Sequence, residues 1–336
     1  MTTDIDKLVA SLDKELGENH GNQQVSQFID TNYPPLNKII SGKYEGGLPF
    51  GRIVEMYGDF SSGKTALATD WMIKAQEMGG AAIFIDWERS FSLHLGEQLG
   101  LKTERPHWLY FKPETWEQGN MIANKACHLI RDSGAISNDA PILVVFDSIA
   151  AAVPKSQAEK ELDELTMNDT TALARVSSTT LKTQAQHAEK TNATFLYLNQ
   201  IRLKPGVVYG DPVTTPGGNA MKFFASVRLA ISRTKIMEQS DGKKSFVGQD
   251  IGIKTVKNKI TMPFQECKMR MYFGSEGQAE FDTIASMIDA LVADGQIKAS
   301  GPRVEWDGKS YFKKQLVEFI KENGLRDTLA GMFKSE

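Results

Sequence analysis

A glycine-rich turn at residues 58–65 constrains this chain more than any other segment, because of what flanks it. Residues 53–57 form a short apolar run that predicts a buried strand, and residues 65–78 predict a helix. In such a turn the glycines let backbone N–H groups wrap a phosphate, and the helix N-terminus adds a favourable dipole. The predicted phosphate site consists of Gly58, Asp59, Phe60, Ser61, Ser62, Gly63, Lys64 and Thr65.

Continuous apolar runs alternate with helical stretches between residues 50 and 260. Runs without polar alternation are typical of strands buried on both faces, as in a parallel sheet. The pattern predicts an α/β fold with a mostly parallel central sheet, which binds ligands at the carboxyl ends of its strands. The expected strands are 52–57, 81–86, 142–147 and 194–199, and the expected helices are 65–78, 117–131 and 170–189.

The chain beyond this region changes character. Residues 224–236 and 249–273 predict strands separated by turns, with Gly242 and Gly248 between them. The last ~65 residues predict a separate small α/β domain. Its expected elements are helices at 280–294 and 313–333, a strand at 304–306 and a turn at Asp307-Gly308.

The N-terminal segment predicts an amphipathic helix at 1–17 and a brief strand at 25–29. Such a small element docks either on its own core or on a neighbouring subunit, and the pattern alone leaves both open. The expected division of the chain is 1–32 for this element, 33–272 for the core and 273–336 for the small domain.

The total charge of −3 gives no reason to expect a polyanionic partner, but the charge is uneven. Residues 201–270 hold 13 basic and 5 acidic side chains, a local charge of +8. This stretch favours either an anion-binding surface or a solvated face, and both remain open at this point. Two cysteines suit a reducing cytoplasm, the start lacks the pattern of a secretory signal, and no apolar run is long enough to span a membrane.

Polar residues at the predicted strand ends are candidates for chemistry. Lys64 would reach the β- and γ-phosphates of a nucleotide, Thr65 would bind Mg²⁺, and Asp147 would support that metal. Glu88 is a candidate base for the attacking water, with Asp86 as its competitor. Position alone does not separate these two acids. The amide of Gln200, at the end of another strand, either senses the γ-phosphate or belongs to a loop-capping pair with Asn199.

Residues 201–222 form a long connection without clear periodicity, and long loops of this kind are usually functional or disordered. The loop contains basic residues, one aromatic residue and several glycines, a composition that suits single-stranded nucleic acid. A substrate lid is the alternative. A second polar stretch at 155–171 is expected at the same sheet edge, so the two loops would form one channel.

The sequence resembles the RecA-type recombinases over nearly its whole length. The Asn-Gln-Ile-Arg segment at 199–202 and the Gly-Gly-Asn-Ala-x-Lys-Phe segment at 217–223 are far more specific than the phosphate-binding turn, which many ATPases share. The matching stretches are residues 46–55, 61–65, 147–151, 199–202, 215–223 and 256–260.

The resemblance implies an ATP- and Mg²⁺-dependent enzyme that forms a helical filament on single-stranded DNA, pairs it with duplex DNA and exchanges strands. It implies that Glu88 is the catalytic glutamate, that Gln200 links the γ-phosphate to the DNA loop, and that Lys257 and Lys259 reach the neighbouring subunit's ATP. It places the DNA loops at about 158–170 and 201–219, the N-terminal element on the next protomer, and single-strand-binding and mediator proteins among the partners. The implied DNA-binding residues are Arg175, Lys182, Arg202, Lys204, Tyr209, Gly217, Gly218, Asn219 and Lys222.

The chain also departs from the family pattern. Leu95 stands where a tyrosine commonly stacks on adenine, which predicts looser nucleotide selectivity. The first loop carries about three extra residues and an acidic tract, Pro216 replaces a common threonine, and no long acidic tail follows. These departures indicate a divergent member, such as a phage-encoded one. The alternatives are a ring-helicase-like ATPase on the same core and a mediator that binds DNA without exchanging strands.

Overall fold

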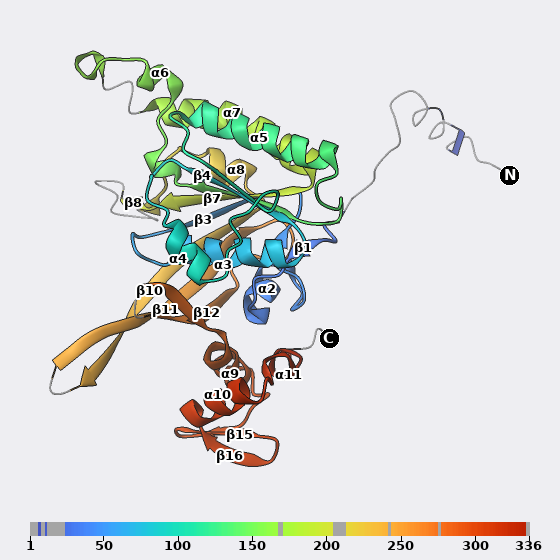
Figure 1. The fold of residues 1–336 in the computed structure, drawn as a ribbon, viewed down its shortest axis with the longest axis vertical. Helices are drawn as coiled ribbons and strands as arrows, with labels where there is room; N and C mark the ends of the chain where they lie inside the picture. Colours follow the sequence, from blue (N-terminus) through green and yellow to red (C-terminus); the bar gives the residue numbers. More distant parts are fainter. Residues whose placement is uncertain are drawn as a thin grey trace.

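A large twisted sheet with helices on both faces forms the body of the protein (Figure 1). The computed structural model describes residues 24–166, 171–203, 213–240, 243–274 and 277–333, together with 6–7 and 11. Within these residues the sheet has nine strands in the order β13-β12-β11-β10-β3-β7-β6-β4-β5. The strands from β10 to β5 pair in parallel, and those from β10 to β13 pair antiparallel. The expected α/β fold is confirmed.

The parallel half of the sheet is buried on both faces, as its continuous apolar runs predict. Alternate residues of each strand join different cores: Ile53 packs with the helices above the sheet, and Val54 with the helix below. The strands are β3 (Ile53–Gly58), β4 (Ala81–Asp86), β5 (Trp108–Phe111), β6 (Ile142–Asp147) and β7 (Ala193–Gln200). The structure reproduces the expected bounds of β4 and β6 and shifts those of β3 and β7 slightly.

Three long helices cover this half. α3 (Lys64–Glu77) lies on one face, and α5 (Trp116–Ser133) and α7 (Ala172–Thr191) lie side by side on the other (Figure 1). Thr115 begins α5 by accepting a hydrogen bond from the Gln118 N–H, and Gly134 ends it in the left-handed conformation. All three expected helices are present. Short helices α2 (Pro34–Ser41) and α4 (Leu93–Gln98) were not predicted from the sequence.

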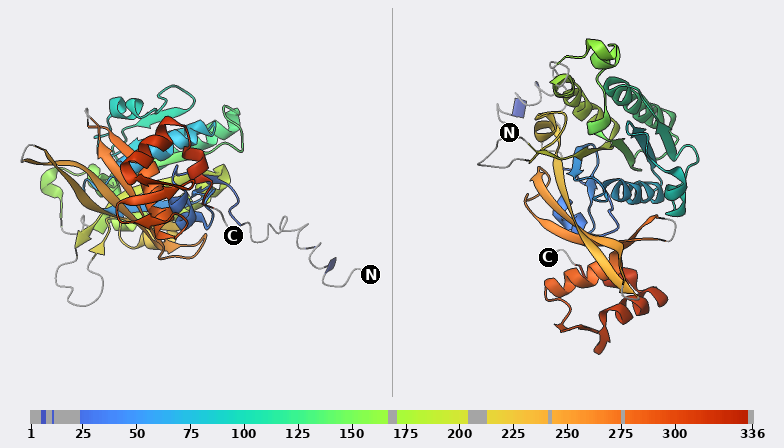
Figure 2. Two further views of the ribbon diagram at one scale, coloured as in Figure 1. Left: turned by 90° about the horizontal axis from the view of Figure 1, so that it is seen from below. Right: turned by 90° about the vertical axis from the view of Figure 1, so that its left-hand side faces the viewer.

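The antiparallel half is built on a long two-stranded ribbon that projects from the body (Figures 1 and 2). The ribbon consists of β10 (Val227–Ser240) and β11 (Lys243–Asn258). The expected strands with turns over 249–273 are present, because residues 259–265 turn the chain back and β12 (Glu266–Phe273) pairs antiparallel with β11. The expected break at Gly248 is wrong, because Gly248 lies inside β11 and pairs with Tyr272. β13 (Ala279–Asp282) completes the sheet.

The C-terminal segment forms a compact unit below the sheet (Figure 1). The expected helix at 280–294 is wrong in its first turn, because β13 occupies those residues and the Asp282 side chain caps α9 (Thr283–Ala293). The expected helix at 313–333 is two helices, because Asn323 and Gly324, the latter with φ +64°, interrupt it. The elements are α9, β14 (Ala299–Ser300), β15 (Arg303–Trp306), β16 (Lys309–Phe312), α10 (Lys313–Glu322) and α11 (Arg326–Ala330).

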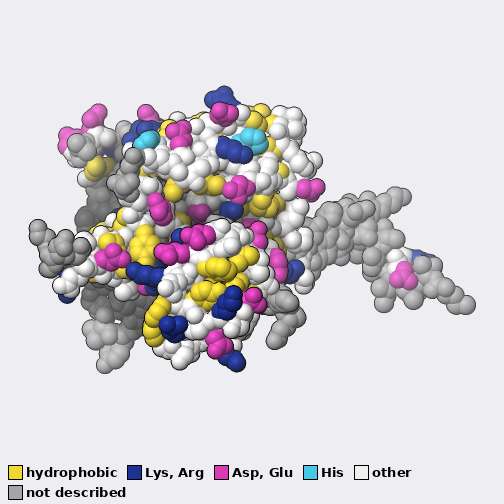
Figure 3. Space-filling model, turned by 60° about the horizontal axis from the view of Figure 1, so that its bottom comes forward, with side chains coloured by type: hydrophobic (Ala, Val, Ile, Leu, Met, Phe, Trp, Pro, Cys, Tyr) yellow, Lys and Arg dark blue, Asp and Glu magenta, His cyan; other side chains and the backbone are white. Residues whose placement is uncertain are grey.

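This unit shares one hydrophobic core with the main sheet, since Ile284 and Leu316 belong to the same buried cluster as Val54. The predicted turn at Asp307-Gly308 joins β15 to β16, and both residues have positive φ, as a tight hairpin requires. On the face viewed in Figure 3, basic and acidic side chains are interspersed around apolar ones, so the charges of both signs are mixed there.

The strand of the N-terminal segment docks on its own chain. β1 (Phe28–Ile29) pairs antiparallel with β2 (Leu48–Pro49), and Ile29 is fully buried. This answers, for residues 28–29, the question that the sequence left open. The predicted helix at 1–17 lies outside the described residues except for 6–7 and 11. Across the part of the chain that the structure describes, no helix is both long and apolar enough to cross a membrane.

Candidate active site

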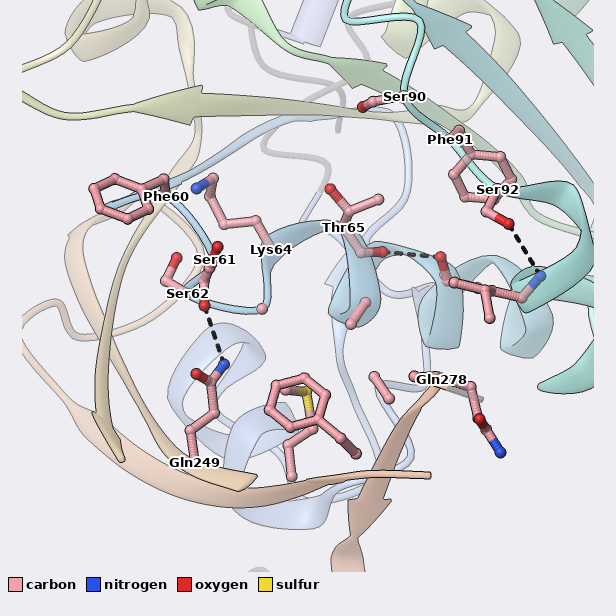
Figure 4. A pocket seen from close by; sticks show the side chains of 18 of the residues that line it. Phe60, Ser61, Ser62, Lys64, Thr65, Ser90, Phe91, Ser92, Gln249 and Gln278 are labelled. Carbon is pink, nitrogen blue, oxygen red and sulfur yellow. Dashed lines mark hydrogen bonds between the residues drawn. The ribbon is translucent and has the colours of Figure 1, made fainter. Parts of the chain in front are cut away.

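A cavity of about 740 Å³ lies at the carboxyl ends of the parallel strands. Its floor is the turn at 58–65, as the sequence predicts, and the ribbon of β10 and β11 forms the opposite wall. Phe60, Ser61 and Lys64 stand at one end, Phe91, Ser92 and Gln278 at the other, and Thr65 between them (Figure 4).

The turn has the backbone of an anion cradle. Gly63, with φ +93°, stands directly before α3, where the first N–H groups of the helix are unpaired. A Cβ at Gly58 would lie 2.5 Å from the Ile231 carbonyl oxygen, so only glycine fits there. The Ser62 hydroxyl is buried and has no hydrogen-bond partner among the described residues, so it is available to a phosphate oxygen. These features fit a bound phosphate chain.

The Lys64 ammonium folds back over the turn. Its Nζ donates to the carbonyl oxygens of Asp59 (2.8 Å) and Gly58 (3.1 Å). Burial lowers the pKa of Lys64, while Asp147, Glu88 and Asp59 oppose that effect. The Lys64 ammonium is therefore hydrogen-bonded to neutral carbonyl oxygens of the turn. The charged oxygens of a bound phosphate would be stronger acceptors and would replace them.

Thr65 and Asp147 come together across the strand ends. The Thr65 hydroxyl donates to Asp147 Oδ2 at 2.9 Å, and only 4% of Asp147 is exposed. Burial raises the pKa of Asp147 to about 7, with the nearby Glu88 adding to the effect. A hydroxyl and a carboxylate are oxygen donors that suit Mg²⁺, which binds few protein groups and keeps several waters. The pair fits the metal that the sequence predicts.

The two acids that position could not separate have different surroundings. Asp86 is 1% exposed, and its oxygens accept hydrogen bonds from Arg89 N (2.6 Å), Phe91 N (3.2 Å) and the Tyr110 hydroxyl (2.8 Å). Asp86 therefore holds the loop that follows it. Glu88 lines the cavity.

Glu88 is joined to the ends of two neighbouring strands. Its Oε1 accepts a hydrogen bond from Gln200 Nε2 (3.1 Å), at the end of β7, and another from the Ser148 hydroxyl, just past β6. Gln200 also lines the cavity. Ser148 was not predicted as a site residue, although it follows Asp147 directly and lies in a stretch that resembles the family.

The ribbon contributes a wall that the sequence did not reveal. Arg233 Nη1 and Gln249 Nε2 each donate to the Ser61 carbonyl oxygen at 3.3 Å, and the Arg233 guanidinium lies 5.5 Å from the centre of the Phe60 ring. Lys235 and Phe246 of the same ribbon also line the cavity. Arg233 and Gln249 lie 172 and 188 positions from Ser61 in the chain, and only the register of β10 and β11 brings them to the turn.

Apolar side chains line part of the cavity. Leu95, at the position noted in the sequence, is one of them, together with Phe91, Leu99, Met271 and Phe273. The Ser92 hydroxyl accepts a hydrogen bond from Leu95 N at 3.3 Å and thereby begins α4. An apolar wall of this kind suits the flat face of a nucleobase.

The loop after Gln200 starts as a short hairpin. β8 (Arg202–Leu203) pairs with β9 (Val213–Thr214), so the expectation of an irregular loop is wrong at its base. The predicted DNA-binding residues Lys204 and Tyr209 lie outside the described residues. Arg202 is exposed, Lys222 is half-buried in α8 (Ala220–Phe224), and Asn219 is exposed just before that helix.

Gly217 and Gly218 have a structural reason to be glycine. Their φ angles are +85° and +72°, in the left-handed region. A Cβ at Gly218 would lie 2.9 Å from that of Ala174 on α7, and one at Gly217 would lie 3.2 Å from Ile149 Cγ2. The two glycines therefore let the returning end of the loop lie against α7.

Asn199 anchors the same end of the loop. Its Nδ2 donates to the Pro216 carbonyl oxygen (3.1 Å) and to Glu55 Oε1 (2.9 Å). Glu55, which is fully buried, accepts a second hydrogen bond from Arg228 Nε on Oε2 at 2.5 Å. Asn199 thus has the loop-anchoring role that the sequence left as one of two alternatives, while Gln200 points to the cavity.

The remaining predicted residues lie outside the cavity. Arg175 and Lys182 are exposed on α7, seven residues apart and so on one side of the helix. Lys257 Nζ donates to the carbonyl oxygens of Lys222 (2.6 Å) and Phe223 (2.9 Å), and burial lowers the pKa of Lys257 to about 8. Lys259 is exposed. Neither lysine lines the cavity of its own chain.

Comparison with known proteins accounts for this arrangement. The family model of the RecA N-terminal domain matches residues 8–278. This chain belongs to the RecA family. Protein RecA of Geobacter sulfurreducens is 38% identical over 263 residues, covering 78% of this chain and 72% of that protein. Protein RecA of Frankia casuarinae is 34% identical over 328 residues, covering 95% and 88%. RecA 1 of Myxococcus xanthus is 36% identical over 280 residues, covering 83% and 76%.

The resemblance read from the sequence motifs is thereby confirmed. Membership of the RecA family also agrees with the mixed sheet and with the phosphate-binding turn at 58–65, which lies at the strand ends. The match to the RecA family model ends in the turn between β12 and β13, close to where the C-terminal unit begins.

Proposed function

We propose that this RecA-family protein is an ATP- and Mg²⁺-dependent recombinase. It forms a helical filament on single-stranded DNA, pairs that strand with homologous duplex DNA and exchanges the strands. The observation that carries the proposal is the hydrogen bond between Glu88 and Gln200, since it joins a cavity acid to the residue from which the loop at 201–219 departs.

The residues of the cavity have distinct tasks in ATP hydrolysis. The turn at 58–65 binds the phosphates through its backbone N–H groups, and Lys64 leaves its two carbonyl acceptors for the β- and γ-phosphates. Thr65 and Asp147 would hold Mg²⁺, which neutralises the charge that develops on the phosphates. Glu88 accepts a proton from the attacking water.

Gln200 couples the nucleotide to DNA. With ATP bound, its amide exchanges Glu88 for the γ-phosphate, and the start of the loop at 201–219 moves with it. Asn199 holds the far end of the same loop through Pro216, so β7 carries both anchors. DNA contacts come from Arg202, Lys204, Tyr209, Asn219 and Lys222 in and after this loop, from Arg175 and Lys182, and from the backbone at Gly217 and Gly218.

The filament places ATP between protomers. Lys257 and Lys259 do not line the cavity of their own chain, so a role in catalysis requires the cavity of a neighbouring copy. Within the N-terminal element at 1–32, the part before β1 joins protomers, while residues 28–29 pair with their own chain. The core spans 33–272, and the C-terminal unit spans 273–336. Repeating one basic loop per protomer along a filament multiplies the avidity for a single strand. Single-strand-binding and mediator proteins are the expected partners in a cytoplasmic setting.

Two substitutions test the proposal. Lys64→Ala should lose ATP binding, filament assembly and strand exchange together. Glu88→Gln should bind ATP and assemble into filaments. Its rate of DNA-stimulated ATP hydrolysis should be about 10²–10⁴-fold lower than that of the wild type, which is the usual contribution of a general base. The measurements are nucleotide binding, ATPase with and without single-stranded DNA, and strand exchange.

Full strand exchange by Lys64→Ala without nucleotide binding would contradict this mechanism. Closed rings in place of filaments by electron microscopy would favour a helicase-like ATPase, and DNA binding without any ATP turnover would favour a mediator.

A further inference from the structure

The carboxylate of Glu88 is held by two hydrogen bonds on one of its two oxygens. Both the Ser148 hydroxyl and Gln200 Nε2 donate to Oε1. A carboxylate has about four acceptor positions, so two donors on Oε1 leave Oε2 to accept a proton from water. The side chain of Glu88 cannot rotate its oxygens without breaking both hydrogen bonds.

The two donors differ in what surrounds them. Gln200 is half-buried and begins the loop toward β8, so its position depends on that loop. Ser148 is 1% exposed and follows β6, a strand whose residues are all buried. The buried core therefore holds the Ser148 hydroxyl in place. The amide of Gln200 can leave Glu88 for another partner when the loop moves.

The backbone reinforces the fixed side. The Asp147 carbonyl oxygen accepts hydrogen bonds from both Trp87 N (2.8 Å) and Glu88 N (3.1 Å). Glu88 is thus joined to the 147–148 segment through its main chain and its side chain. These hydrogen bonds fix Glu88 relative to Asp147, the proposed metal-binding carboxylate, and they do not involve Gln200.

We propose that Ser148 is a positioning residue for ATP hydrolysis. Its hydroxyl orients Glu88 so that Oε2 faces the attacking water, and it retains this contact when Gln200 turns to the γ-phosphate. The proposal rests on the proposed function, in which Glu88 is the base. No bond to Ser148 is made or broken in the reaction.

Ser148→Ala should lower the DNA-stimulated kcat for ATP about 10–100-fold, a part of what a general base contributes. The KM for ATP, and filament assembly with a non-hydrolysable ATP analogue, should stay within about twofold, since neither depends on the orientation of Glu88. Ser148→Thr keeps the hydroxyl and should recover activity. Ser286→Ala is the matched control, because Ser286 is also buried and hydrogen-bonded but lies in α9, away from the cavity.

A double-mutant cycle separates positioning from a structural role. In a Glu88→Gln background, Ser148→Ala should change the residual rate less than about twofold, because the carboxylate that Ser148 orients is gone. The proposal would be overturned if the two substitutions lowered the hydrolysis rate by independent factors that multiply in the double variant. A Ser148→Ala enzyme with wild-type kcat would overturn it as well. If Ser148→Ala does not fold, a Ser148→Thr enzyme that folds but stays as slow as Glu88→Gln has the same consequence.

The cycle also distinguishes this inference from the proposed function. Wild-type hydrolysis by Glu88→Gln would remove Glu88 as the base and the proposed mechanism with it. An inactive Glu88→Gln enzyme beside a fully active Ser148→Ala enzyme would overturn the role of Ser148 alone.

Discussion

Asn199 and Gln200 are adjacent on β7, yet their side chains serve different networks. Successive residues of a strand point to opposite faces, so Asn199 meets the buried Glu55 while Gln200 meets Glu88 in the cavity. Arg228, the partner of Glu55 in the parallel pairing of β10 with β3, forms an ion pair with the other carboxylate oxygen. Two neighbouring residues therefore connect the nucleotide site, the sheet interior and the loop.

Asp70 on α3 gives the protein a pH-dependent stability. Burial raises the pKa of Asp70 to about 7, against an ordinary value of 3.8. Between about pH 4 and pH 7 the folded state holds this proton while the unfolded state has lost it, so stability falls as the pH rises through that window. Asp70→Asn should therefore gain in free energy of unfolding relative to wild type from pH 5 to pH 8, as measured by urea denaturation.

The matched control for this prediction is Asp132→Asn, which changes an exposed aspartate on α5. Its difference from wild type should be the same at both pH values. A difference for Asp70→Asn that does not change with pH would contradict the prediction.

At the scale of elements, local patterns predicted what depends on neighbours in sequence. Buried parallel strands such as β4 and β6 were predicted to the residue, because a short continuous apolar run bounded by turns is typical of a strand covered on both faces. The wall made by Arg233 and Gln249 was not predicted, since it depends on how β10 and β11 pair and fold over the turn at 58–65. Pairing register at long sequence distance leaves no local signal.

The same contrast holds within the site. Lys64, Thr65 and Asp147 were predictable because the chemistry of a phosphate site fixes their spacing to a strand or a helix. The hydrogen bond between Ser148 and Glu88 was not, because it joins the ends of two parallel strands 60 residues apart.

Gly218 lies where the returning end of the proposed DNA-binding loop packs against α7, which makes it sensitive to substitution. Gly218→Ala places a methyl group 2.9 Å from Ala174 Cβ and forces a left-handed alanine, which alone costs about 1–2 kcal/mol. We expect lower stability and weaker binding of single-stranded DNA, since the returning end of the loop must move. Urea denaturation and fluorescence anisotropy with a labelled oligonucleotide measure the two effects.

Gly79→Ala is the control, because Gly79 has a similar φ of +76° and no described atom lies within 4 Å of its Cβ position. Gly79→Ala should lower the free energy of unfolding, because it also forces a left-handed alanine, while its affinity for single-stranded DNA stays at the wild-type level. Equal DNA affinities for the two variants would refute the role assigned to the packing of Gly218 on α7.

At the scale of the whole molecule, the charge of −3 conceals the +8 of residues 201–270. This stretch holds the loop that we propose binds DNA, the basic edge of the ribbon, and Lys257 and Lys259, which we propose act at a protomer interface. Affinity for single-stranded DNA should therefore depend steeply on salt, since each neutralised phosphate releases counterions.

Neutralising Arg202, Lys204 and Lys222 together should lower the slope of log K against log salt by about 0.7 for each phosphate that the variant no longer neutralises, hence by up to about 2. Neutralising the exposed Lys102 and Lys125, which lie outside this stretch, should leave the slope unchanged. Titrations of a labelled oligonucleotide at several salt concentrations decide between the outcomes, and an unchanged slope for the triple variant would place the DNA-binding surface elsewhere.

The two carbonyl acceptors of Lys257 have a consequence for the two ends of the proposed filament. An ammonium that holds the end of α8 in a free protomer cannot also reach a neighbour's phosphate, so each head-to-tail joint of that filament would exchange one set of acceptors for the other. The protomer at one terminus would have no such neighbour, and its own lysine would stay bound to α8. Growth and shedding at the two termini of the proposed filament would therefore involve different α8 conformations, which would give it a chemical direction.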